Sequence, residues 1–126
     1  ARYDQQPIEA AAMIAACDAA YRATADRMWL RHAETCFRWF LGDNDAGQPV
    51  YVDATGGCCD GVQEDGLNRN RGAESTLAWL YSLAYMYDLQ AEGLLGWSPE
   101  TYDSESDDST SSRESSTQPT KASAAP

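Results

Sequence analysis

The side chains best suited to chemistry gather in one polar stretch in the middle of the chain. Two carboxylates, Asp60 and Glu74, flank a run that contains Asn68, Asn70 and Arg71, with glycines on both sides of the run. Carboxylates accept hydrogen bonds from hydroxyl groups or act as acids and bases, amides both donate and accept, and a guanidinium group donates from a rigid fork. This set predicts a site that orients sugar hydroxyls or a phosphate.

The two carboxylates are the candidate catalytic residues. Glu74 falls in the first turn of an expected helix, where free N–H groups and the helix dipole stabilise the anionic form. We therefore predict that Glu74 accepts hydrogen bonds from hydroxyls or acts as a base, and that Asp60 turns inward as a second carboxylate. Simpler explanations stay open, namely helix-start electrostatics for Glu74 and an Asx-turn for Asp60.

Asn68, Asn70 and Arg71 are the candidate substrate-binding residues, because amide and guanidinium groups alternate there over four residues. The alternative is a structural loop, in which asparagine adopts left-handed backbone angles and arginine donates to carbonyl groups.

The cysteines argue against a metal site. Cys17 and Cys36 fall within helical patterns and have the character of small apolar core residues, whereas Cys58 and Cys59 are adjacent and lack the spacing of zinc ligands. A metal site would have to combine the only histidine, His32, with these thiols. We predict no metal and no cofactor, and a reducing, cytoplasmic setting.

Two helices precede the polar stretch. An Ala-rich helix is expected from Ile8 to about Arg22, after a proline that suits the first helical position. A second is expected from Arg27 to about Leu41. Because so few residues separate them, they should pack antiparallel as an αα-hairpin. The second helix carries one apolar stripe, made of Trp29, Ala33, Cys36, Phe37 and Phe40.

A long segment follows, in which no sustained period appears as far as Arg71, although Pro49 to Asp53 could run extended. Loops of this length inside compact domains are usually functional or disordered. Its apolar side chains favour an ordered loop; they are Tyr51, Val52, Cys58, Cys59, Val62 and Leu67.

The third helix, from about Ala73 to Ala91, is apolar nearly all round. Such a helix is buried nearly all round, and two preceding helices cannot provide that cover. The chain also begins at Ala1 rather than Met, so we expect a fragment or a partner subunit. One face of the helix carries Leu77, Leu80, Tyr81, Ala84 and Tyr87, and another carries Trp79, Leu83 and Met86.

Composition divides the chain into a folded part, 1–97, and a tail, 98–126. The tail is rich in Ser, Thr, Pro and acidic residues, which predicts disorder. The net charge of −11 opposes binding to nucleic acid. No run of about 18 apolar residues exists, so no membrane span is expected.

A combination of motifs covers the chain from Pro7 to Gln90: the Ala-rich helix, FRWFLGDND at 37–45, TGGCCDG at 55–61, NRNRGAEST at 68–76 and LAWLYSLAYM at 77–86. This combination resembles the C-terminal, six-hairpin-glycosidase-like (α/α) toroid region of bacterial retaining glycosyltransferases. The resemblance implies an all-α fold, here a helical hairpin plus a third helix that form part of a toroid. It also implies that Asp60, Asn68, Asn70 and Glu74 lie at a central sugar-binding cavity.

The function that this resemblance implies is that of a C-terminal fragment of a carbohydrate-active enzyme, foremost a glycosyltransferase whose transfer site lies upstream of Ala1. Its partners would be a carbohydrate or nucleotide-sugar-derived substrate and the upstream domain of the same protein. One alternative is a glycoside hydrolase or an epimerase-like toroid, in which Asp60 and Glu74 do acid/base work directly. Another is a non-catalytic helical module whose apolar faces bind a partner protein.

Overall fold

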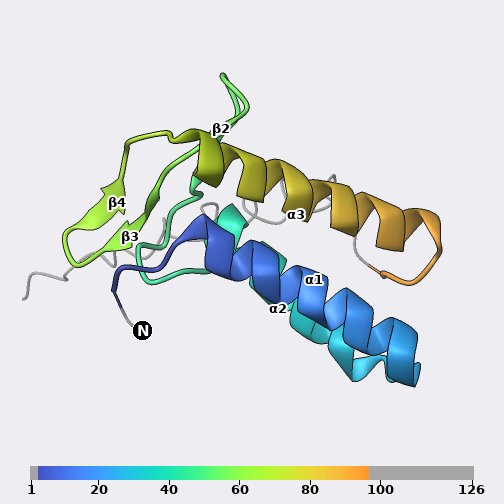
Figure 1. The fold of residues 1–126 in the computed structure, drawn as a ribbon. Helices are drawn as coiled ribbons and strands as arrows, with labels where there is room; N and C mark the ends of the chain where they lie inside the picture. The colour runs from blue at the N-terminus through green and yellow to red at the C-terminus, as the bar shows by residue number, and fades with distance from the viewer. Residues whose placement is uncertain (1–2, 97–126) are drawn as a thin grey trace, which may run out of the picture. The chain divides into compact units, whose positions relative to one another are not determined.

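The computed structural model describes residues 3–96, which form three helices and two small antiparallel β-hairpins (Figure 1). The tail predicted at 98–126 lies outside the described residues. The helices are α1 (Pro7–Thr24), α2 (Met28–Leu41) and α3 (Ala73–Ala91), in good agreement with the predicted bounds. Strand β1 (Tyr51–Val52) pairs with β2 (Gly57–Cys58), and β3 (Gly61–Gln63) pairs with β4 (Gly66–Asn68).

Helices α1 and α2 form the predicted αα-hairpin, and α1 also packs along α3 (Figure 1). Ala25 takes a left-handed conformation that ends α1, with φ of 56°. Asp26 then caps α2, because its Oδ1 accepts the N–H of Met28 at 2.8 Å. The buried core between the helices includes Ile14, Cys17, Leu30, Ala33, Phe37 and Phe40.

One face of α3 closes this core. Trp79 stacks on Phe37 of α2, with ring centroids 5.6 Å apart, and on Tyr51 of β1, with centroids 5.0 Å apart. Met86 and Leu89 lie further along the same side of α3 and are fully buried. The aromatic stack therefore holds α2, β1 and α3 together, because each of these elements contributes one ring.

The opposite side of α3 is uncovered by the residues that the structure describes. Leu77 is 54% exposed, Leu80 46%, Tyr81 65% and Tyr87 54%, and Ala84 is exposed beside them. We call these five residues the open face of α3. Its exposure confirms the prediction that the two preceding helices cannot cover so apolar a helix.

The segment between α2 and α3 differs from the long loop that the sequence predicts, because it holds both hairpins. Strands of two or three residues are too short to produce a recognisable period. The chain before α1 joins this region: the Gln5 N–H donates to the Val62 carbonyl at 3.1 Å, and the Val62 N–H donates back at 2.9 Å. Gly61 allows this approach, because a Cβ there would collide with the Gln5 carbonyl oxygen.

The fold is therefore mostly helical with two small hairpin sheets rather than purely α-helical. The three helices of residues 3–96 do not by themselves close a ring of helical hairpins. Within the same residues, no helix is long and apolar enough to cross a membrane.

Candidate functional site

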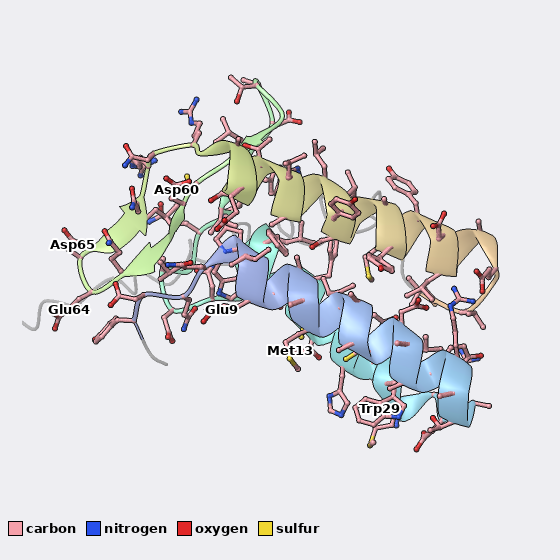
Figure 2. All side chains as sticks on the ribbon, viewed as in Figure 1. Glu9, Met13, Trp29, Asp60, Glu64 and Asp65 are labelled. Atoms are coloured by element: carbon pink, nitrogen blue, oxygen red, sulfur yellow. The ribbon has the colours of Figure 1, made fainter. Side chains whose placement is uncertain are left out.

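A polar surface cleft of about 420 Å³ lies where the first turns of α1 and α3 meet strand β4. The bridge between Gln5 and Val62 brings the two helix starts together, because it ties the residues just before α1 to the hairpin just before α3. Figure 2 shows Asp60 beside the first turn of α3, with Glu64 and Asp65 at the far tip of the β3–β4 hairpin. The cleft is lined by Gln6, Pro7, Ile8, Asp60, Asn68, Gly72, Ala73, Glu74 and Ser75.

Asp60 holds the start of α3. Its Oδ1 accepts the backbone N–H of Gly72 and the hydroxyl of Ser75, both at 2.7 Å. Gly72 is the residue before the helix and has no side chain to cap it, so Asp60 provides the cap from twelve residues earlier. A Cβ on Gly72 would lie only 3.0 Å from that oxygen, so a larger residue would push the Asp60 carboxylate away by a few tenths of an ångström.

The backbone of Asp60 is hydrogen-bonded to the segment that leads from β4 to α3. Its N–H donates to the carbonyl groups of Asn68 at 3.0 Å and Asn70 at 2.9 Å. Nearby, the Cys58 N–H donates to the hydroxyl of Thr76 on α3 at 3.3 Å. The hairpin region and the helix start therefore form one hydrogen-bonded unit.

Glu74 lies on the exposed first turn of α3 and lines the cleft. No other described side chain or backbone group makes a hydrogen bond or ion pair with its carboxylate. The carboxylate is therefore available to a ligand. The sequence predicts this position, and its role as a base or acceptor stays a prediction.

Of the three predicted binding residues, one lies at the cleft. Asn68 is half-buried in β4 and lines it, and its Oδ1 accepts the N–H of Asn70 at 3.2 Å. Asn70 and Arg71 are exposed and do not belong to the lining. Arg71 instead runs its aliphatic stem past Gly57. The structure thus brings Asp60, Asn68 and Glu74 together, without Asn70 and Arg71.

Gln6 and Ser75 belong to the cleft but were not predicted from the sequence. Gln6 stands immediately before α1, where its backbone N–H donates to Glu9 Oε2 at 3.0 Å. That local pattern marks a helix start, but it gives no sign that this start lies beside α3. Ser75 is 7% exposed and has the polar partner that a buried hydroxyl needs in Asp60.

Cys58 and Cys59 are buried behind the cleft and do not line it. Burial, together with the proximity of Cys59 and Asp60, raises the pKa of the Cys58 thiol to about 12. Cys58 is therefore protonated at neutral pH and unsuited to act as a nucleophile. Within residues 3–96, no three His, Cys, Asp or Glu side chains gather closely enough to hold a metal ion.

A second cavity, of about 440 Å³, lies between α1 and α2 and is mostly apolar. Met13 and Trp39 line it, and Figure 2 shows Met13 and Glu9 along α1. Its polar groups already serve the fold: the Trp39 indole N–H donates to Gln5 Oε1 at 2.7 Å, and Glu9 accepts the Gln6 N–H at 3.0 Å. The cleft at the two helix starts is therefore the better candidate site.

The cleft suits a neutral ligand rich in hydroxyl groups. Its lining offers two carboxylates and two side-chain amides, which accept from and donate to hydroxyls. Its described lining residues include no Lys, Arg or His, and two carboxylates would repel a phosphate.

No protein-family model matches the chain, and no curated protein shows significant similarity to it.

Proposed function

We propose that this chain is a sugar-binding helical unit of a carbohydrate-active enzyme, a glycosyltransferase, and that its cleft holds a neutral sugar. The observation that carries the proposal is the convergence of Asp60, Asn68 and Glu74 on one cleft whose described lining has no basic side chain. The resemblance of residues 7–90 to the toroid region of retaining glycosyltransferases supports the same substrate class.

The free polar atoms of the cleft give each residue a distinct role. Glu74 accepts a hydrogen bond from a sugar hydroxyl with one carboxylate oxygen, which leaves its other oxygen open. Asn68 uses its Oδ1 on Asn70, which leaves its amide N–H groups to donate to the ligand. Asp60 uses Oδ1 to hold Gly72 and Ser75, which leaves Oδ2 as an acceptor.

The hydrogen bonds that Asp60 already makes favour a sugar-binding role for the cleft over a role in glycoside hydrolysis. A glycoside hydrolase needs two carboxyl groups that are both free to act on the glycosidic bond and its water or nucleophile. Asp60 anchors a helix with one oxygen, through two bonds of 2.7 Å. We assign Asp60 to positioning and hydroxyl binding, and the transfer chemistry to an upstream domain of a cytoplasmic protein.

In this proposal the three helices are the last hairpins of an (α/α) toroid. The exposed apolar side of α3 supports that view, because a toroid surrounds such a helix with neighbouring hairpins. The polar cleft at the starts of α1 and α3 is where a toroid places its ligand.

The proposal is tested by titrating the ¹⁵N-labelled 126-residue chain with glucose, galactose, mannose and maltose. At least one of these sugars should shift the amide signals of Asn68, Gly72 and Glu74, and glucose 6-phosphate should bind more weakly because of the two carboxylates. Removing one hydrogen-bonding group should weaken binding about tenfold in Glu74→Gln or Asn68→Ala.

Asp53→Asn is the matched control, because Asp53 is an exposed acid in the turn between β1 and β2 and does not line the cleft. It should bind the sugar as the wild type does. The proposal fails if no probe shifts the cleft signals at tens of millimolar, or if Asp53→Asn weakens binding as much as Glu74→Gln.

A further inference from the structure

The open face of α3 has acidic residues at both ends. Glu74 and Asp88 are exposed, and each stands seven residues from Tyr81. Since seven residues make about two helical turns, the three side chains lie along one line of the helix surface. Apolar groups fill the distance between the two carboxylates, so the face is an apolar stripe with a negative charge at either end.

Both carboxylates are available to a partner. Glu74 and Asp88 make no ion pair with any residue of the described chain, whereas the next acid, Glu92, pairs with Arg22 at 3.0 Å. Helix α3 contains no Lys or Arg that could neutralise either charge from its own surface.

The charge pattern opposes pairing of α3 with a second copy of itself. In an antiparallel pair related by a two-fold axis at Tyr81, Glu74 of one copy would lie opposite Asp88 of the other, at both ends. In a parallel pair each acid would lie opposite its own counterpart. Like charges facing each other across a helix interface are unfavourable in either case.

We propose that the open face of α3 is an interaction surface for a partner helix that has an apolar stripe with Lys or Arg at both ends, about 21 Å apart. Each basic side chain pairs with Glu74 or Asp88, and the stripe covers Leu77, Leu80 and Tyr81. The inference depends on α3 alone and holds whether or not the cleft binds a sugar. It makes the chain half of a heterotypic interface.

Reversing one charge tests the proposal within the 126-residue chain. Asp88→Lys turns both like-charge contacts of the antiparallel pair into attractive contacts with Glu74. In sedimentation equilibrium the wild type should be a monomer, and Asp88→Lys should dimerise roughly tenfold more tightly than Asp88→Asn, which only removes the repulsion. Adding Leu80→Asp to Asp88→Lys should abolish the dimer.

A peptide probe gives an independent readout on the unaltered chain. A peptide of residues 73–91 that carries Glu74→Lys and Asp88→Lys should bind the wild-type chain roughly tenfold more tightly at low salt than the unaltered peptide, and the difference should shrink at high salt. The proposal is overturned if the wild type dimerises through α3, if Asp88→Lys associates no more than Asp88→Asn, or if the two peptides bind alike. Failure of the sugar titration would not affect any of these readings.

Discussion

At the residue scale, Asp60 combines two tasks that are usually separate. One oxygen holds the start of α3, and the residue also lines the cleft. The sequence offers an Asx-turn or a ligand-facing carboxylate for Asp60, whereas in the structure its Oδ1 accepts from Gly72 and Ser75 and so holds the start of α3. The hydrogen-bond donors to the Asp60 carboxylate could not be predicted from the sequence, because they lie on residues twelve and fifteen positions later.

Replacing Asp60 should destabilise the fold more than the loss of an ordinary surface acid. Asp60→Ala leaves the Gly72 N–H and the buried Ser75 hydroxyl without an acceptor, and we expect a loss of about 2–3 kcal/mol in the free energy of unfolding. Asp60→Asn keeps one acceptor oxygen and should lose about 1 kcal/mol. Urea denaturation measures both values, and a loss below about 0.5 kcal/mol for Asp60→Ala would contradict the assigned cap.

Cys58 should make stability depend on pH in the alkaline range. The thiol has an ordinary pKa of 9.0 and a pKa of about 12 in the folded chain. The folded state therefore keeps a proton that the unfolded state loses above pH 9. The contribution of Cys58 to the free energy of unfolding is fully present below pH 9. It falls between pH 9 and pH 12, by up to about 1.4 kcal/mol per pH unit. Cys58→Ala should lack this part of the slope, and parallel slopes in the two proteins would refute the prediction.

At the element scale, α3 has two apolar faces, one buried and one exposed. Met86 is 1% exposed, whereas Leu80 is 46% exposed. The apolar pattern predicts that both faces exist and that two helices cannot cover them. It cannot tell which face meets α1 and α2, because that depends on where Trp79 finds its aromatic partners.

Alanine substitutions on the two faces should separate packing from partner binding. Met86→Ala should cost about 2–5 kcal/mol of unfolding free energy through the cavity that it leaves. Leu80→Ala should change stability by less than about 0.5–1 kcal/mol but weaken binding of the lysine-substituted α3 peptide. Thermal unfolding and peptide titration provide the two measurements. Equal destabilisation by both substitutions would mean that the open face is covered.

The helices and the hairpins differ in how well the sequence predicts them. The bounds of α3 follow from a continuous helical pattern that begins after Gly72, and those of α2 from its single apolar stripe. The strands are two or three residues long, so pairings such as Tyr51 with Cys58 leave no periodic trace. Their existence depends on tertiary contacts, including the Gln5–Val62 bridge, and these are not encoded locally.

At the scale of the whole molecule, one aromatic cluster joins elements that are far apart in the sequence. A domain of this size buries a modest core, so single contacts matter. Trp79 makes several such contacts, because its ring lies against Phe37 and Phe40 of α2 and Tyr51 of β1. The lining of the cleft could be predicted only in part from the sequence. Glu74 follows from its position in a helix, whereas Gln6 lines the cleft only because the fold sets α1 beside α3.

Trp79→Ala should therefore destabilise the whole unit rather than one element, by about 3–5 kcal/mol. We expect the thermal transition followed by circular dichroism to shift far down in temperature and to broaden. Trp29→Ala is the matched control, because Trp29 is half-buried at the start of α2, with His32 as its one aromatic neighbour among the described ring contacts, at 6.0 Å. Similar midpoints for the two variants would show that the aromatic stack does not unify the fold.

The cap that Asp60 provides also sets an order of assembly. The turn of three residues between α1 and α2 lets that pair form from contacts close in sequence. Helix α3 has no side-chain cap of its own, so we expect its first turn to be stable only once β3 and β4 have paired and brought Asp60 to Gly72. Because contacts that are distant in sequence form more slowly, we expect the cleft, which also needs the Gln5–Val62 bridge, to form after the α1–α2 pair during refolding.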